Sequence, residues 1–167
     1  FDSLTKLANR ATLIDSLQQA IIITDARDTH GALIFIDLDH FKKINDLLGH
    51  TTGDHLLIEV AHRLSSTVRD SDLVARFGGD EFVILVQPLS HDPQVACREL
   101  DELMERLQQA LNQPYSLLGP QSQPLQHHSS ASLGSIMFHD RHLSAEELIR
   151  RADIAMYRAK EAGRNQT

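Results

Sequence analysis

The chain has 167 residues, of which 41% are hydrophobic and 23% charged, as expected for one globular domain and not for a disordered chain. Its formal net charge of −7 argues against a nucleic-acid-binding surface, and no apolar run approaches the ~20 residues that cross a bilayer. Cys97 is the only cysteine, which excludes an internal disulfide and favours a cytoplasmic domain, even if the parent protein is anchored in a membrane.

Hydrophobic periodicity, glycines and prolines divide the chain into helices and strands. The first helix follows a capping-type start at Asp2-Ser3 or Thr5. In chain order, the pattern predicts a helix over 10–26, a strand over 32–36, a helix over 41–48, a helix after Gly53, strands over 73–77 and 81–86, a helix over 92–112, a strand over 132–138 and a helix from 144 to about 162. The proline-rich stretch 113–128 favours a loop with short strands at its edges.

The strands at 73–77 and 81–86 flank Gly78-Gly79, which predicts a β-hairpin whose turn needs positive φ angles. Strands and helices otherwise interleave, so we expect an α/β (α+β) domain with a mixed sheet and helices packed on it. No repeat or linker interrupts residues 1–167, which we treat as one domain. Because the chain does not begin with Met, we expect this domain to come from a longer protein.

Two acidic clusters are candidates for a metal site. Asp37 and Asp39 follow the apolar strand, and alternation along a strand puts their side chains on one face. A helix cap is an equally good interpretation of Asp39, whereas for Asp37 a metal is the better one. Asp80 and Glu81 follow the Gly-Gly turn, where no Cβ blocks a ligand. Taken alone, this turn could be a plain solvated one; beside Asp37 it could complete a Mg²⁺ site.

Four segments in the expected order resemble the GGDEF domains, the diguanylate cyclase family. They are Asp2-Ser3-Leu4-Thr5-Lys6-Leu7-Ala8-Asn9-Arg10, residues 35–54 from Phe35-Ile36-Asp37-Leu38-Asp39 to Gly53-Asp54, Arg76-Phe77-Gly78-Gly79-Asp80-Glu81-Phe82, and residues 151–165. The chain departs from the family at Lys6, where Gly is usual, at Leu38, where Ile is commoner, and at the polar stretch 127–130, where an apolar strand is expected. The resemblance implies a central, mostly antiparallel sheet of about five strands surrounded by helices, similar to the adenylyl cyclase and polymerase palm.

The resemblance also implies a metal site. Asp37, the backbone carbonyl of Leu38 and Asp80 resemble the magnesium ligands, with Mn²⁺ as an alternative ion. Glu81 resembles the residue credited with metal binding or with activating the 3′-hydroxyl. Lys42 resembles a triphosphate contact and is expected to act in catalysis with Asp80 and Glu81, because a cation there would offset charge on departing pyrophosphate.

For the nucleotide, Asn45 and Asp54 resemble the guanine readers, and Lys160 and Arg164 resemble triphosphate contacts. Gly78 and Gly79 would let substrate approach the backbone. Lys160 and Arg164 are four residues apart, which in a helix places both on one face near its end. A favourable interaction with the helix C-terminus is the alternative for that pair.

Five residues separate the end of Arg69-Asp70-Ser71-Asp72 from Gly78. Relatives with Arg-x-x-Asp at this offset bind product there, so Arg69 and Asp72 resemble an inhibitory site; a surface ion pair is the alternative. The ten histidines complete no zinc ligand set with one cysteine, and most are expected at the surface. His50 is expected to support the loop before Asp54.

The resulting hypothesis is a Mg²⁺-dependent diguanylate cyclase that condenses two GTP into cyclic di-GMP and two pyrophosphates. The site of one domain cannot hold both GTP molecules, so we expect a homodimer through the catalytic face. We also expect product feedback inhibition and an upstream sensory or regulatory domain. Two alternatives stay open: a catalytically inactive domain that binds cyclic di-GMP or GTP, and a dimerisation module.

Overall fold

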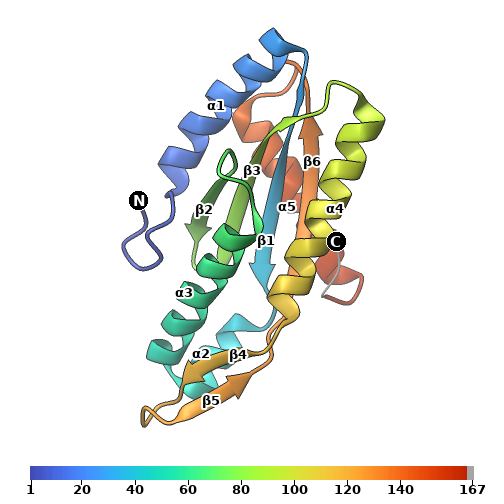
Figure 1. Ribbon diagram of the computed structural model, residues 1–167. Helices are drawn as coiled ribbons and strands as arrows, with labels where there is room; N and C mark the ends of the chain where they lie inside the picture. Colours follow the sequence, from blue (N-terminus) through green and yellow to red (C-terminus); the bar gives the residue numbers. More distant parts are fainter. Residues whose placement is uncertain (165–167) are drawn as a thin grey trace.

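A fully buried strand organises the computed structural model, which describes residues 1–164 (Figure 1). This strand, β1 (His30–Leu38), lies between β3 (Glu81–Leu89) and β6 (Ala131–Phe138), and β2 (Leu73–Gly78) completes the order β2-β3-β1-β6. All three strand pairings are antiparallel, so this sheet is not the mixed one expected from the interleaved strands and helices. Within the described residues this sheet has four strands, where the resemblance implied about five.

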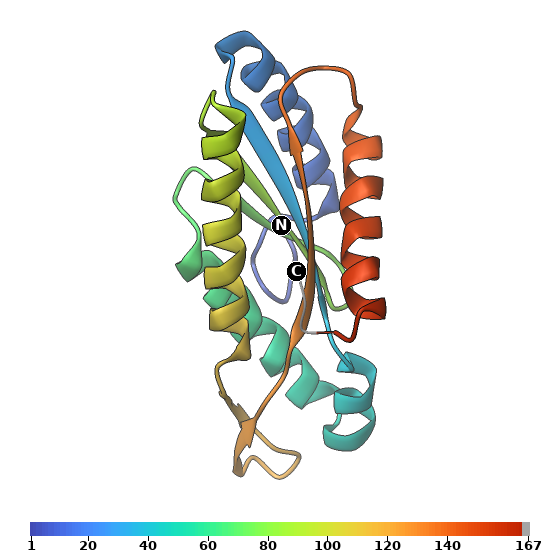
Figure 2. The same ribbon diagram turned by 90° about the vertical axis from the view of Figure 1, so that its right-hand side faces the viewer.

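Helices cover both faces of the sheet, as the interleaved pattern predicted (Figures 1 and 2). One face carries α3 (His50–Thr67) and α4 (Pro93–Asn112), and the other carries α1 (Arg10–Arg27) and α5 (Ala145–Glu161). None of the helices within residues 1–164 has the length and apolar composition needed to cross a membrane.

The helix starts follow local capping. The side chain of Asn9 accepts a hydrogen bond from Thr12 N and caps α1, so the predicted cap at Asp2-Ser3 or Thr5 was wrong. The carboxylate of Asp2 instead accepts from the backbone and hydroxyl of Thr5 in a turn that precedes the helix. At α5 the predicted cap is confirmed, because the hydroxyl of Ser144 accepts from Glu147 N.

The junction between α2 (Phe41–Leu48) and α3 corrects a second expectation. Gly49, at φ 87°, turns the chain so sharply that α3 begins at the next residue, His50, and Gly53 lies inside the helix. The predicted loop before Asp54 therefore does not exist, and exposed His50 has no loop to support.

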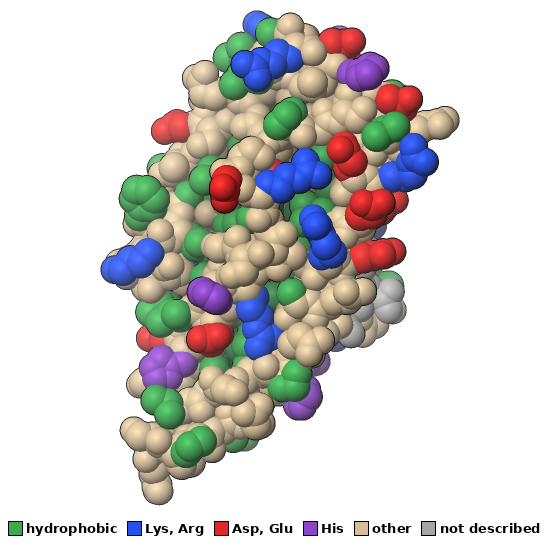
Figure 3. Space-filling view, viewed as in Figure 1, with side chains coloured by type: hydrophobic (Ala, Val, Ile, Leu, Met, Phe, Trp, Pro, Cys, Tyr) green, Lys and Arg blue, Asp and Glu red, His purple; other side chains and the backbone are tan. Residues whose placement is uncertain are grey.

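The stretch 113–128 does contain two short strands, β4 (Tyr115–Leu118) and β5 (Pro124–His127), which pair with each other apart from the main sheet. Arg63 holds this ribbon to the domain by donating to the carbonyls of three residues, Ala110, Gln113 and Pro114. Figure 3 shows hydrophobic and histidine side chains at this end of the molecule, whereas acidic and basic side chains gather over α4.

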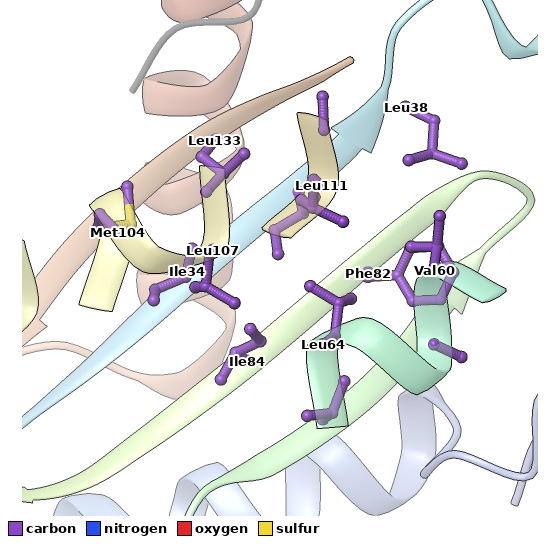
Figure 4. Packing of buried hydrophobic residues seen from close by; sticks show 14 of the residues in the cluster. Ile34, Leu38, Val60, Leu64, Phe82, Ile84, Met104, Leu107, Leu111 and Leu133 are labelled. Atoms are coloured by element: carbon purple, nitrogen blue, oxygen red, sulfur yellow. The ribbon is translucent and has the colours of Figure 1, made fainter. Parts of the chain in front are cut away.

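The alternation along β1 divides the core in two. Ile34, Ile36 and Leu38 point toward α3 and α4, while Leu33 and Phe35 point toward α1 and α5. Figure 4 shows the first of these layers, in which side chains of three strands meet residues of both helices. Full burial of each such side chain contributes about 1.5–3 kcal/mol, so the sheet between the two layers is a rigid support for the residues at its end.

Candidate active site

Acidic residues from two strands meet where β1 ends. Asp37 stands opposite Glu81 in the β1–β3 register, and Leu38 N donates to the backbone oxygen of Asp80 at 3.3 Å. The hairpin turn is thereby tied to the end of β1. The structure thus brings together three of the predicted metal-binding side chains, Asp37, Asp80 and Glu81, at one end of the sheet.

A cation from the far end of the chain joins this cluster. Lys160, in the last turn of α5, places its Nζ 2.5 Å from Oδ1 of Asp37. The two side chains are 24% and 12% exposed, so the ion pair is largely shielded from solvent. Lys160 was predicted to contact triphosphate, and the structure places it beside the acidic cluster.

The carboxylates carry more negative charge than the site balances. Burial raises the pKa of Asp37. The neighbouring carboxylates of Asp80 and Asp39 raise it further, and only Lys160 opposes the rise. Burial likewise raises the pKa of Glu81. The neighbouring carboxylates of Asp37, Asp153 and Asp80 add to that rise. A cation bound here would therefore relieve repulsion that the protein alone leaves in place.

The donor set fits a hard divalent cation. Oxygen atoms are the ligands that Mg²⁺ prefers, and it commonly takes one or two carboxylates with water and phosphate oxygens completing its coordination. Within residues 1–164 no three His, Cys, Asp or Glu side chains are already arranged around one point. A site of this kind needs only Asp37, Asp80 or Glu81, and a backbone oxygen such as that of Leu38.

Asp39 hydrogen-bonds to β6 and its neighbouring segment and does not cap α2. Its carboxylate accepts hydrogen bonds from the hydroxyls of Ser130 at 2.6 Å and Ser132 at 2.8 Å. His40, in the left-handed region at φ 58°, occupies the cap position of α2 and makes no side-chain cap. The helix-cap interpretation of Asp39 was therefore wrong. Because Ser132 stands opposite Asp37 in β6, Asp37 and Asp39 do share a face.

Arg76, to which the sequence pattern assigned no role, holds the hairpin turn. Arg76 donates from Nε and Nη2 to the carbonyl oxygen of Gly79, at 3.0 and 2.8 Å. Its Nη1 also reaches both carboxylate oxygens of Asp2, at 3.2 and 3.3 Å. Of the two glycines predicted to need positive φ angles, Gly79 has one, 38°, whereas Gly78 lies in β2 and does not. The guanidinium thus fixes the turn that presents Asp80 and ties it to the N-terminal segment.

The predicted guanine readers meet where α2 packs on α3. The side chain of Asn45 lies against Gly53, so closely that a Cβ on Gly53 would stand 1.9 Å from Oδ1 of Asn45. This Oδ1 is buried and has no hydrogen-bond partner within the described part of the chain. Asp54, next to Gly53, is exposed, as is Lys42 on α2. An unused acceptor and a solvent-facing carboxylate therefore lie close together.

Arg164 corrects the helical-spacing argument. The helix α5 ends at Glu161, and Arg164 follows Gly163 in the left-handed region, at φ 62°. Its side chain is exposed, and its position relative to Lys160 is set by a turn in which Arg164 N donates to Lys160 O. The spacing of four residues therefore does not place the two cations on one helical face.

The segment from Arg69 to Asp72 contains no ion pair between its end residues. The carboxylate of Asp72 accepts from the backbone N of Arg69 at 3.0 Å and of Gln87 at 3.3 Å. It closes a turn, while the side chain of Arg69 is exposed and pairs with no carboxylate in residues 1–164. The surface-ion-pair interpretation was therefore wrong.

A carboxylate on α5 was also missed. Asp153 is close enough to raise the pKa of Glu81, although it is exposed. It precedes Lys160 by seven residues, two helical turns, which places the two on the same side of α5. That spacing was the signal available in the sequence.

Comparison with known proteins gives a consistent result. Residues 1–166 match the family model described as diguanylate cyclase, GGDEF domain. The chain is 43% identical over 164 residues to the bifunctional diguanylate cyclase/cyclic di-GMP phosphodiesterase MucR of Pseudomonas aeruginosa, covering 98% of this chain and 22% of that protein. It is 37% identical to the diguanylate cyclase DgcS of Shewanella oneidensis, covering 99% of this chain and 51% of that one.

Solved structures agree. The GGDEF domain of TpbB from Pseudomonas aeruginosa superposes with a TM-score of 0.86 at 34% identity, covering 98% of this chain and 90% of that one. The GGDEF domain of DgcB from Caulobacter crescentus, solved in complex with c-di-GMP, gives 0.86 at 28% identity, with 99% and 92% covered. The chain spans about half or less of the curated relatives named above.

Proposed function

Because the chain belongs to the diguanylate cyclase GGDEF family, we propose that it condenses two GTP molecules into cyclic di-GMP and two pyrophosphates. The observation that supports this most directly is the cluster at the end of β1. There Asp37, Asp80 and Glu81 repel one another, and Lys160 balances part of their charge.

In this proposal Asp37, Asp80, Glu81 and the carbonyl of Leu38 hold Mg²⁺ or Mn²⁺. The ion, when bound, supplies positive charge against the triphosphate and its leaving pyrophosphate. The chain's own cations act in the same direction. Lys160 is already held at the cluster by Asp37, while Lys42 and Arg164 are exposed and can reach a nucleotide at the surface.

Glu81 is the residue best suited to accept the proton from the attacking 3′-hydroxyl. A general base works best when its pKa approaches the working pH, and burial and neighbouring carboxylates move the pKa of Glu81 in that direction. Its position beside the hairpin turn keeps it half-buried and within the acidic cluster.

Guanine is proposed to bind between α2 and α3. Guanine presents N–H donors along one edge, and the unpaired Oδ1 of Asn45 and the carboxylate of Asp54 are acceptors for them. Gly53 leaves room for Asn45, because any side chain there would occupy the position of its amide oxygen. Adenine carries an acceptor where guanine carries N1–H, so this pair of acceptors selects against ATP.

The reaction joins two nucleotides, and one domain offers one such site within its described residues. We therefore propose that two copies face each other through their catalytic ends, each positioning one GTP for attack on the other. The exposed side chain of Arg69 supports a product site away from this face, because a guanidinium fork binds phosphate and guanine well. An upstream sensory domain in a longer, cytoplasmic-facing protein completes the proposal.

The test is to incubate the purified chain with GTP and Mg²⁺ and to quantify cyclic di-GMP and pyrophosphate by chromatography. We expect product from the wild-type chain and none without a divalent ion. A dimeric wild-type chain that binds GTP and forms no product would contradict the cyclase assignment and favour a binding module.

A further inference from the structure

A cleft of about 360 Å³ lies between α2 and the segment that joins β5 to β6. Figure 2 shows both at the same end of the molecule. The residues of α2 in the cleft are mainly apolar, and those of the joining segment are polar. The apolar residues on α2 are Ile44, Leu47 and Leu48, and the polar residues of the joining segment are His127, His128, Ser129 and Ser130. None of the residues assigned to metal, nucleotide or product lines it.

Hydrogen bonds hold the cleft open in one shape. Asp39 N donates to Ser130 O at 2.9 Å, and the carboxylate of Asp39 accepts from the hydroxyls of Ser130 and Ser132. These bonds fasten the joining segment to the turn between β1 and α2. A ligand entering the cleft would therefore not have to order its walls, which lowers the cost of binding.

Two polar atoms in the wall have no partner. The Nε2 of His127 and the hydroxyl oxygen of Ser129 are buried without a hydrogen bond in the described part of the chain. Leaving such a group unsatisfied costs about 1–3 kcal/mol, so each would gain from a hydrogen-bond partner. Burial lowers the pKa of His127, and His128 lowers it further, which favours the neutral ring. A neutral imidazole offers one N–H donor.

The cleft has one cation that can pair with an anion. Lys43 lines it and forms no ion pair with any residue in 1–164, and His40 lies nearby. Asp39 is the one carboxylate among the lining residues, and it accepts hydrogen bonds from two serine hydroxyls. Leu47, one turn after Lys43 on the same helix, is 80% exposed, so α2 presents a cation beside an apolar surface to the cleft.

We propose that this cleft is a binding site for a small apolar acid, a compact hydrophobic molecule that carries one anionic group. The hydrophobic body packs on Ile44, Leu47 and Leu48. The anionic group accepts hydrogen bonds from Ser129 and the N–H of His127 and pairs with Lys43. The site is separate from the proposed function, and it holds whether or not the chain turns over GTP.

The probe for the test is 8-anilinonaphthalene-1-sulfonate, an aromatic body with one sulfonate, titrated into the whole chain while its fluorescence is followed. We expect saturable one-to-one binding. Lys43→Glu and Leu47→Glu should each weaken binding about tenfold or more, because one reverses the charge and the other disrupts the apolar wall. Both residues are exposed, so circular dichroism should show an unchanged fold.

Three controls keep the outcome clear. Ile22→Glu makes the same apolar-to-acidic change at a 44% exposed position of α1 and should leave binding unchanged. N-phenyl-1-naphthylamine, the same body without the sulfonate, should bind more weakly. Lys160→Ala should retain binding. The proposal is overturned if the wild-type chain shows no saturable binding or if binding survives Lys43→Glu and Leu47→Glu. It is overturned equally if the uncharged probe binds as tightly or if Lys160→Ala abolishes binding.

Discussion

The Nζ of Lys160 lies 2.5 Å from Oδ1 of Asp37, although 123 residues separate them in the chain. The contact joins the last turn of α5 to the end of β1, and it is the main influence that lowers the pKa of Asp37 against burial and its acidic neighbours. Even with this ion pair, the pKa values of Asp37 and Glu81 are raised. The carboxylates of the site therefore repel one another, and a bound cation would relieve that repulsion.

This repulsion predicts a pH dependence of stability. A carboxyl group whose pKa is raised on folding favours the folded state at low pH, and that contribution is lost as pH rises through its folded-state pKa. Without a divalent ion, Glu81→Gln should therefore raise the free energy of unfolding by a few tenths to about 1 kcal/mol at pH 7–8 and have little effect near pH 4.

Urea unfolding of the two chains at both pH values measures this difference. Glu102→Gln, at an exposed position of α4, is the matched control and should change stability little at either pH. A Glu81→Gln chain that is less stable than wild type at pH 8 would show that Glu81 makes a net favourable interaction when ionised.

The second prediction concerns the metal. Mg²⁺ should raise the midpoint of thermal unfolding of the wild-type chain by a few degrees, because it binds the folded state and not the unfolded one. Asp80→Ala should remove both this shift and all turnover of GTP, with the fold intact because Asp80 lies in a turn. Asp15→Ala, an exposed carboxylate on α1, should keep both. An undiminished Mg²⁺ shift in Asp80→Ala would remove Asp80 from the metal site.

The third prediction separates guanine binding from stability. A methyl group at Gly53 meets the end of the Asn45 side chain, which can rotate away, and alanine gains about 1 kcal/mol of helix propensity over glycine inside α3. Gly53→Ala should therefore leave stability near wild type and lower GTP affinity roughly tenfold, since Asn45 is displaced.

Titration calorimetry of GTP and ATP checks this prediction. Asp54→Ala should also weaken GTP binding, because guanine loses an acceptor, and its preference for GTP over ATP should fall without vanishing. Thr51→Ala, exposed in the first turn of the same helix, is the control. If Gly53→Ala and Asp54→Ala both bind GTP like wild type, guanine does not lie between α2 and α3.

Local patterns predicted those elements whose conformation depends on residues close to one another in the chain. The apolar run of β1 and the Gly78-Gly79 pair, where β2 ends and the turn begins, admit few structures, so strand and hairpin followed from them. The start of α3 could not be predicted in the same way. Whether Gly49 ends one helix loosely or turns the chain directly into the next depends on how α2 packs against α3.

The residues of the candidate site could be predicted from the sequence, but most of the contacts between them could not. The family resemblance named Asp37, Asp80 and Lys160, but the ion pair between the first and last depends on how α5 packs across β6 and β1. The bond between Asp39 and two serines likewise joins residues more than 90 positions apart. Such pairings arise from tertiary packing, for which a single sequence carries no periodic signal.

The fourth prediction follows from a departure from the family. Lys6, where glycine is usual, adopts a φ of 64° in the turn closed by Asp2 O, a conformation that costs a side chain about 1–2 kcal/mol. Lys6→Gly should stabilise the chain by about 0.5–1 kcal/mol, the gain being reduced by the greater entropy of unfolded glycine. Thermal and urea unfolding measure it. Lys6→Ala keeps the strain and should give no such gain; equal stabilisation by both would exclude backbone strain as the cause.

The last prediction concerns the product. Arg69 precedes β2, whose six residues span roughly 20 Å to the hairpin, so a molecule bound at Arg69 would not touch the acidic cluster. Bound product could instead hold two domains apart, which lowers the rate without altering either site. Arg69→Ala removes a guanidinium that no carboxylate of residues 1–164 engages, so it should cost little stability. It should relieve inhibition by added cyclic di-GMP roughly tenfold or more and leave the initial rate near wild type.

Progress curves with and without added cyclic di-GMP make the measurement, with Arg106→Ala on α4 as a control that removes an equally exposed arginine. Asp72→Ala is less informative, because its carboxylate closes the turn by accepting from the backbone of Arg69 and Gln87, and its loss disturbs the loop itself. A lower initial rate in Arg69→Ala with inhibition unchanged would place Arg69 in catalysis or in domain pairing. If saturating cyclic di-GMP does not slow the wild-type chain, this turn has no inhibitory role.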